Sequence, residues 1–249
     1  MKRLFLACTP RTGNLWFRKL LASALEITAV AAHSPLKIDW DALPDGFLVA
    51  MHWHRTKEMQ DLLRERRIDV LVTVRHPLDI LISILRFSQF EPATAFWLEG
   101  EGGSETVLKD ANPADRRFLD YALSERAAAL FSVSLEWLRQ ARAVVRYEDL
   151  VENPQKTLQE VLDTLGEAAT RPLDEAIRSF EISQLRSVTG KHCWLGRPGL
   201  WRAVISDEYR QAIYQKHCSV FEAFGYTVAG PKLTAEEALS NWRDLLVSK

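Results

Sequence analysis

Cysteine and long apolar runs are scarce in this sequence of 249 residues. The three cysteines, Cys8, Cys193 and Cys218, are widely spaced, which indicates neither a disulfide framework nor a zinc site and fits a reducing compartment. No stretch approaches the roughly 18 apolar residues of a membrane span. The apolar run from Leu4 to Cys8 is also shorter than the core of a signal peptide, which needs about 7–15 residues. We therefore expect a cytoplasmic protein without a membrane span.

An excess of charge of one sign is also lacking. Lys and Arg number 32 against 33 Asp and Glu, so the net charge is −1 and no global basic field favours nucleic acid as a partner. An anionic ligand must instead be held by local groups. Hydrophobic residues make up 47% of the chain, which is enough for a buried core, and no linker divides it. We expect one domain over residues 1–249.

Short apolar runs alternate with helical patterns along the chain. Strands are predicted at residues 4–8, 47–51, 69–74 and 143–147. Helices are predicted from about residue 14 and at 56–67, 78–90, 114–141, 154–165, 172–181, 206–223 and 234–247. Loops are predicted at the acidic, glycine-rich residues 99–105 and at 190–201. This alternation predicts an α/β fold, a parallel β-sheet flanked by helices on both faces.

The first predicted strand runs into Thr9-Pro10-Arg11-Thr12-Gly13-Asn14 before a helix. Gly13 lets the backbone come close to a ligand, the helix start offers free N–H groups, and Arg11, Thr12 and Asn14 add donors. These features indicate a cradle for phosphate or sulfate. The alternative is an ordinary strand-to-helix turn capped by a threonine. The P-loop pattern G-x-x-x-x-G-K-[ST] is absent.

Polar residues follow two further strands. Arg75 follows residues 69–74, and Ser83 comes eight residues later on the next helix. Arginine suits the grip of a phosphate, although a surface ion pair and a small helix-contact residue are the plain alternative. His52 and His54 follow residues 47–51, and they are open to three interpretations: a metal pair, a general base, or structural histidines.

The loop from Trp194 to Trp201 contains Gly196, Arg197 and Gly199. Its glycines and arginines suit a flap over an anionic ligand. A rigid surface turn anchored by tryptophans is the alternative.

Together these segments resemble the sulfotransferases that use 3'-phosphoadenosine-5'-phosphosulfate (PAPS). Residues 8–16 are similar to the family's T-Y-P-K-S-G-T-T-W segment, and residues 74–83 to its strand-end Arg with a Ser eight positions on. His52 lies where the family has its catalytic His, 23 residues before Arg75. Residues 146–154 resemble R-Y-E-D-L…N-P, and residues 196–201 resemble the late loop that ends in G-x-W.

The resemblance implies transfer of a sulfuryl group from PAPS to a hydroxyl or amine of a small-molecule acceptor, in one in-line step without a metal. It implies His52 as the general base and Arg11 as a second catalytic residue. The donor-binding residues that it implies are Arg11, Thr12, Gly13, Asn14, Leu15, Trp16, Arg75, Ser83, Tyr147, Gly196 and Arg197.

The sequence departs from the family pattern at three places. Arg11 replaces the loop lysine, and Ala50 replaces a lysine two residues before the catalytic His. Trp194-Leu195-Gly196 replaces Arg-Lys-Gly, with Arg197 just after it. Trp16 stacks on the adenine or packs in the core, and Tyr147 approaches the adenine or packs behind it.

Two other functions stay open on the sequence alone: a nucleoside or small-molecule kinase, and a catalytically inactive nucleotide-binding protein. The kinase should have a Walker lysine and Mg²⁺-binding residues, which we do not find, and the inactive protein would not need His52. The acceptor, the oligomeric state and the role of residues 99–105 cannot be read from the sequence.

Overall fold

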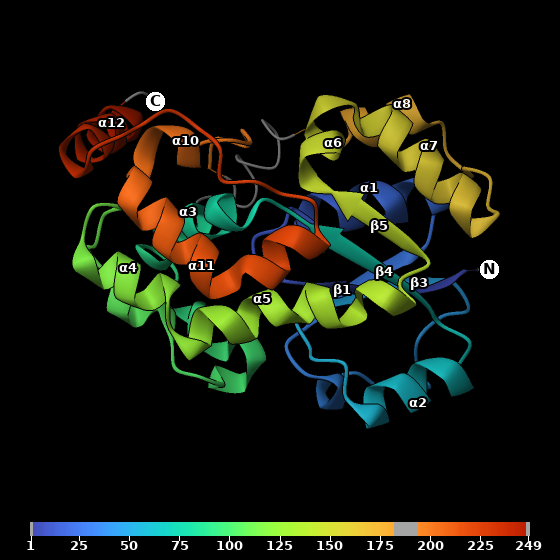
Figure 1. Cartoon of the computed structure of the whole chain (residues 1–249). Coiled ribbons are helices and arrows are strands. Elements are labelled where there is room, and N and C mark those ends of the chain that lie inside the picture. Colours follow the sequence, from blue (N-terminus) through green and yellow to red (C-terminus); the bar gives the residue numbers. More distant parts are fainter. Residues whose placement is uncertain (1, 182–193, 248–249) are drawn as a thin grey trace. The chain divides into compact units, whose positions relative to one another are not determined.

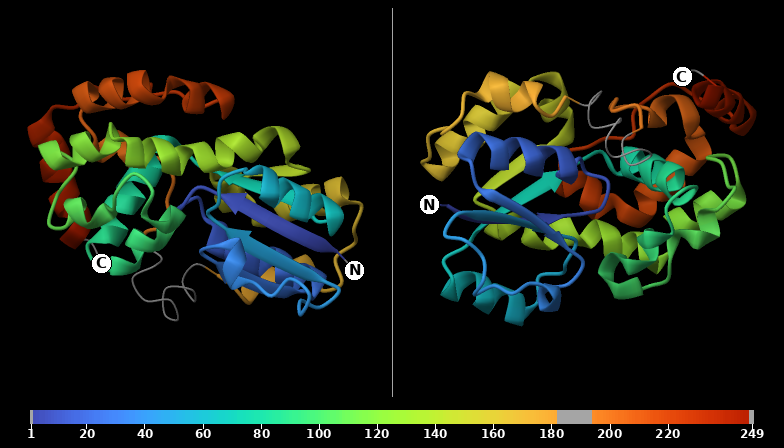
Figure 2. Two further views of the ribbon diagram at one scale, coloured as in Figure 1. Left: turned by 90° about the horizontal axis from the view of Figure 1, so that it is seen from below. Right: turned by 180° about the vertical axis from the view of Figure 1, so that it is seen from behind.

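The strands of the chain form one five-stranded parallel sheet among the described residues (Figures 1 and 2). The structure is a computed structural model that describes residues 2–181 and 194–247. Its strands, in chain order, are β1 (Arg3–Cys8), β2 (Thr28–Ala32), β3 (Phe47–Met51), β4 (Asp69–Val74) and β5 (Ala143–Arg146). Their order across the sheet is β2-β3-β1-β4-β5, and every neighbouring pair is parallel. The α/β fold expected from the sequence is confirmed.

The central strands are apolar because both faces of the sheet are covered. Residues Leu4–Cys8 of β1 and all five residues of β3 are buried, so neither strand shows the polar alternation of a half-exposed sheet. Strand β2 was not predicted. It is an edge strand of sequence Thr-Ala-Val-Ala-Ala and is largely exposed, so it lacks the bulky apolar run that marks the others.

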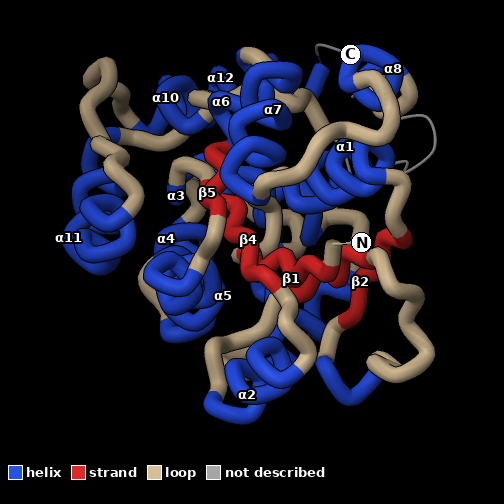
Figure 3. The backbone as a smooth tube through the Cα atoms, turned by 90° about the vertical axis from the view of Figure 1, so that its right-hand side faces the viewer, coloured by secondary structure: helices blue, strands red, loops and turns tan. Residues whose placement is uncertain are grey.

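The chain forms two compact units, which we describe separately: residues 1–75 with 132–196, and residues 76–131 with 197–249. The expectation of one domain over residues 1–249 stays a prediction. The helices of the first unit are α1 (Asn14–Leu25), α2 (Lys57–Glu65), α6 (Tyr147–Glu152), α7 (Pro154–Leu165), α8 (Leu173–Arg178), the end of α5 (Glu125–Trp137), and the short η1 (Pro35–Lys37) and η4 (Leu138–Gln140). Helices α1 and α7 lie on one side of the strands and α2 on the other (Figure 3).

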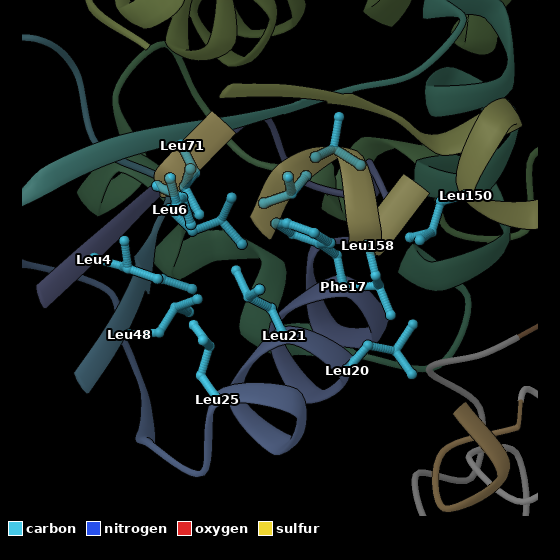
Figure 4. Close-up of a cluster of buried hydrophobic side chains, with 14 of the residues drawn as sticks. Leu4, Leu6, Phe17, Leu20, Leu21, Leu25, Leu48, Leu71, Leu150 and Leu158 are labelled. Atoms are coloured by element: carbon cyan, nitrogen blue, oxygen red, sulfur yellow. The ribbon is translucent and has the colours of Figure 1, made fainter. Parts of the chain in front are cut away.

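The core of the first unit lies between the sheet, α1 and α7 (Figure 4). Its members come from these three elements and from Leu150 of α6. Most of its side chains are leucines, and Phe17 of α1, which is 0% exposed, packs among them. The start of α1 is therefore fixed by packing directly above the ends of β1 and β3.

Helix α7 begins and ends as the sequence predicts, whereas α2, expected over residues 56–67, spans only Lys57–Glu65. Thr56 caps α2 by accepting a hydrogen bond from Met59 N. Asn153 caps α7, and Gly166, with φ 68°, ends it. None of the helices in residues 2–181 and 194–247 is long and apolar enough to cross a membrane.

The second unit is helical. Its helices are α3 (Pro77–Ser88), α4 (Arg116–Ala122), the start of α5, α10 (Trp201–Val204), α11 (Asp207–Ala223) and α12 (Ala235–Val247), with η2 (Pro92–Gly100) and η3 (Glu105–Leu108). The single helix expected over 114–141 is therefore wrong: α4 ends at Ala122 and α5 starts at Glu125, and η4 follows α5.

The acidic segment at residues 99–105 is not simply a solvated loop. Glu105 is fully buried. Its carboxylate accepts hydrogen bonds from Arg126 Nε at 2.7 Å and from Tyr121 OH at 3.0 Å. Arg126 also donates to the carbonyls of Trp97 and Glu101 at 3.0 and 2.8 Å. One buried ion pair thus fixes both ends of this segment within the second unit.

Candidate functional site

The carboxyl edge of the sheet gathers polar residues of the first unit. Val74 pairs with Arg146 across β4 and β5, so the next residues, Arg75 and Tyr147, are neighbours. Cys8 pairs with Thr73, so the loop after β1 starts beside the end of β4. Ligands of parallel α/β sheets collect at this edge.

The loop after β1 is held by hydrogen bonds from beneath. Thr9 N donates to Ser134 Oγ at 2.8 Å, and this hydroxyl donates to Thr73 O at 2.9 Å. Thr12 Oγ1 donates to Thr9 O at 2.8 Å and lies 2.8 Å from Thr73 Oγ1. The Thr12 side chain is thus committed to the fold, and its backbone is what it can offer a ligand. A threonine cap is not formed, since Gly13 is the N-cap of α1 and no side chain bonds there.

Gly13 is required by its backbone and by a neighbouring ring. Its φ is 80°, in the left-handed region that favours glycine. A Cβ atom on Gly13 would also collide with Cδ2 of Tyr147. The sequence analysis assigned this glycine to the close approach of a ligand, and the structure adds the close approach of Tyr147. After it, the first N–H groups of α1 lack helical acceptors, as at any helix start.

Arg75 is a cation enclosed by the first unit, with only 7% of its surface exposed. Its Nη1 donates to the Arg11 carbonyl at 3.1 Å, and its guanidinium carbon lies 4.3 Å from the centre of the Tyr147 ring. Its Nε is buried without a hydrogen-bond partner, and it forms no ion pair with a carboxylate of the described residues. Burying a charge without a counterion is costly, so this site is suited to an anion.

His52 follows β3 and turns its ring to β1. Its Nδ1 lies 2.6 Å from the Cys8 carbonyl and 3.5 Å from the Cys8 thiol. Because a carbonyl can only accept, Nδ1 carries the proton, and the lone pair of the neutral ring is on Nε2. Burial lowers the pKa of His52 to about 4, the bond to Cys8 opposes this, and nearby cations including Arg11 add to it. Burial also raises the pKa of the Cys8 thiol to about 12, so Cys8 is not a nucleophile at neutral pH.

His54 is in a different position from His52. Its Nδ1 lies 3.1 and 3.3 Å from the two carboxylate oxygens of Glu136 and 3.4 Å from Ser132 Oγ. Burial raises the pKa of Glu136, but its bonds with His54 and the Arg55 amide outweigh this and lower it. The two histidines therefore do not share a common set of ligands. No cluster of three His, Cys, Asp or Glu side chains in residues 2–181 and 194–247 is placed to hold a metal ion.

The other expected site residues are distributed over both units. Trp16 is 8% exposed in the core, and its indole N–H donates to the Phe180 carbonyl at 2.8 Å. Tyr147 is the first residue of α6 and not the end of a strand. Leu15 and Asn14 form the first turn of α1, partly buried. Their contacts with a donor stay predictions.

In the second unit, Ser83 lies partly buried on α3. Arg197 is exposed, next to Gly196, whose φ is 66°. The first part of the loop predicted at 190–201, up to Cys193, lies outside the described residues.

The sequence analysis missed a residue that anchors this late loop. Asp79, in the first turn of α3, is 1% exposed. Its carboxylate accepts from the Gly199 amide at 2.6 Å and from the Trp201 amide at 3.1 Å. The sequence feature that could have identified Asp79 is an acidic residue in the first helical turn after Arg75-His76-Pro77. The sequence prediction for this segment included only Arg75 and Ser83. The loop that carries Arg197 is thus fixed by backbone bonds to a buried carboxylate.

The fold and this edge define an α/β protein with a buried arginine, Arg75, that has no carboxylate partner among the described residues where β4 ends. No protein-family model matches the sequence, and no curated protein does. Solved structures do match. Mouse sulfotransferase SULT7A1, complexed with PAP, shares 14% identity at a TM-score of 0.68, over 88% of this chain and 84% of that one. Retinol dehydratase with androsterone and the inactive cofactor PAP shares 12% identity at a TM-score of 0.59, over 89% and 82%. Retinol dehydratase in a complex with retinol and PAP shares 13% identity at a TM-score of 0.53, over 93% of this chain and 84% of that one. The chain therefore has the sulfotransferase fold.

Proposed function

We propose that this protein is a sulfotransferase that moves a sulfuryl group from PAPS to the hydroxyl or amine of a small acceptor. Its fold is that of sulfotransferases crystallised with PAP, the product that PAPS leaves after transfer. The observation that carries the proposal is Arg75, a buried cation with an unpartnered Nε at the ligand edge of the sheet.

Arg75 binds the 3'-phosphate of the donor. The Tyr147 ring and the Arg11 carbonyl hold its guanidinium, so little side-chain entropy is lost on binding. The resemblance to the PAPS-dependent sulfotransferases implies Ser83 and Arg197 as further ligands of this phosphate. The 5'-phosphosulfate lies on the loop after β1, on the amides of Thr12, Gly13 and Asn14, where the start of α1 favours negative charge.

His52 is the general base of the transfer. The acceptor oxygen attacks sulfur as its proton passes to Nε2 of His52, and the bond from sulfur to the 5'-phosphate oxygen breaks. The bond from Nδ1 to the Cys8 carbonyl holds the tautomer that this step needs. Arg11 stabilises the charge that develops on the departing phosphate oxygen.

Binding of PAP, AMP and ATP, measured by calorimetry, tests the donor. PAP should bind far better than AMP, because only PAP has a 3'-phosphate. A charged hydrogen bond contributes roughly 1.5–3 kcal/mol, so Arg75→Ala should remove about ten-fold or more of that preference. Arg64→Ala is the matched control, since Arg64 is an exposed arginine of α2 that is paired with Asp61. Equal affinity for PAP and AMP would overturn the donor assignment, and preference for ATP would favour a kinase.

Sulfuryl transfer from PAPS tests the base. General base catalysis supplies about 10²–10⁴ in rate, so His52→Ala should lower kcat by that factor and leave PAP affinity nearly unchanged. His54→Ala should cost much less, because His54 is bound to Glu136. If the two variants exchange these effects, His54 is the base.

A further inference from the structure

Arg18 is a second cation of the first unit without a counterion. It lies on α1, one turn after Asn14, and is partly buried. Its Nε is buried and has no hydrogen-bond partner, and no carboxylate of the described residues forms an ion pair with it. Burial lowers the pKa of Arg18. Nothing in the proposed donor site uses this side chain.

The surroundings of Arg18 are those of the proposed base. The Arg18 guanidinium acts electrostatically on both the Cys8 thiol and the His52 ring, which are 3.5 Å apart. Asn14, one turn earlier on the same helix face, also lowers the pKa of this thiol. Helix α1 packs against β1 and β3, so Arg18, on the same face of α1 as Asn14, lies near the ends of these two strands.

The sheet register adds a further basic residue. Met51 of β3 pairs with Ala32 of β2, so His52 and His33 follow one paired row. His33 is exposed, and its charge also acts on His52. The order β2-β3-β1-β4-β5 places the proposed donor residues of the first unit after β1, β4 and β5, and His33 on the other side of the base, after β2. Arg18 and His33 thus make the surroundings of His52 basic on the side away from the proposed donor residues of β4 and β5.

We propose that the acceptor carries an anionic group, a carboxylate or a phosphate, which Arg18 binds while the acceptor hydroxyl is held at His52. This inference rests on the proposed sulfotransferase function. A planar guanidinium can give two parallel hydrogen bonds to either group. His33, at the same edge, is a further basic side chain beside this site.

Four phenols of similar size test the proposal: 4-hydroxyphenylacetate, 4-hydroxyphenyl phosphate, the neutral 4-hydroxyphenylacetamide, and the cation tyramine. Their binding to the enzyme–PAP complex is measured by calorimetry, and their sulfation by PAPS is measured as kcat and KM. At least one of the two anions should bind about ten-fold or more tightly than the amide, and tyramine should be weakest. The better of the two anions distinguishes a carboxylate from a phosphate ligand.

Variants at two adjacent positions of α1 show whether Arg18 is responsible. Arg18→Met keeps the length of the side chain and removes its charge, so it should raise KM for the anion by about ten-fold and leave the amide unchanged. Arg18→Lys should restore part of the preference. Lys19→Met is the matched control: Lys19 is the next residue on the helix, its ammonium lies 5.2 Å from the Phe180 ring, and it should keep the preference.

The proposal is overturned if the amide or tyramine is preferred, if Arg18→Met keeps the preference for the anion, or if none of the four compounds binds the PAP complex. It is also overturned if Arg18→Met lowers kcat equally for all four, since Arg18 would then act on the transferring group. PAP affinity distinguishes failure of the anionic-acceptor proposal from failure of the proposed sulfotransferase function. A protein that binds PAP but fails these tests loses only the anionic acceptor, whereas one that does not prefer PAP over AMP loses the sulfotransferase assignment itself.

Discussion

Replacing His52 by glutamine should make the stability of the protein less dependent on pH. Burial lowers the pKa of His52 from 6.5 to about 4, and the charges of His33, Arg11 and Arg18 add to the effect. In the unfolded chain the ring regains its ordinary pKa. The folded state therefore keeps His52 neutral at pH values where the unfolded state protonates it.

The sign and size of the effect follow from this difference. Below pH 6.5 the unfolded chain binds more protons at His52 than the folded chain, so acid favours unfolding. The contribution of His52 is fully present above pH 6.5 and is lost as the pH falls toward about 4. The difference of about 2.5 units corresponds to roughly 3 kcal/mol at 1.36 kcal/mol per unit.

Urea unfolding at several pH values between about 7 and 4.5 measures this. The readout is the slope of the free energy of unfolding against pH, because His52→Gln loses the bond to Cys8 and is less stable at every pH. The wild-type protein should lose up to roughly 1.4 kcal/mol more per pH unit than the variant. Parallel curves for the two proteins would show that His52 is not desolvated as described.

Four further predictions concern other parts of the chain. Gly13→Ala should cost about 1–3 kcal/mol more stability in denaturant unfolding than Gly166→Ala, because both glycines have a positive φ but only Gly13 meets a ring; equal costs would contradict this. Arg126→Met should cost about 3–5 kcal/mol in the same assay by leaving Glu105 buried and unpaired, and Arg126→Met/Glu105→Gln should recover part of it. Asp79→Ala should speed hydrogen exchange at the two loop amides that its carboxylate accepts, whereas unchanged exchange would show that the loop is held otherwise. Sulfuryl transfer should survive dialysis against EDTA, and a stoichiometric metal lost together with activity would refute the mechanism.

The strands and helices that carry bulky apolar patterns could be predicted from the sequence. The runs at β1, β3 and β4 are buried on both faces, and such burial leaves an unambiguous signal. Strand β2 was missed because an exposed edge strand needs few large side chains. The break between α4 and α5 was missed because Leu123 and Ser124 carry no glycine or proline signal.

In the candidate site, residues that directly follow a predicted strand could be identified from the sequence. Contacts between segments far apart in the sequence could not. Arg75 and His52 were predicted because each directly follows a strand. The bond from Glu136 to His54 joins residues 82 positions apart, and no local pattern marks such a pair. The ring of Tyr147 against Gly13 likewise depends on the register of β5 with β4, which sequence periodicity does not fix.

The balanced charge of the chain conceals a local imbalance. A net charge of −1 indicated that any anion must be held by local groups. Several arginines lie on exposed helices, where Arg64, Arg116 and Arg178 each form an ion pair with a carboxylate three or four residues away. Arg75 directly follows β4, and Arg18 lies on α1, close to the carboxyl edge of the sheet. Neither forms an ion pair with a carboxylate of the described residues, and the Nε atom of each is buried without a hydrogen-bond partner. Burying an arginine away from a carboxylate costs free energy, and Arg75 is almost fully buried while Arg18 is partly buried. The anions that we propose for these sites, the 3'-phosphate at Arg75 and the acceptor anion at Arg18, would offset that cost.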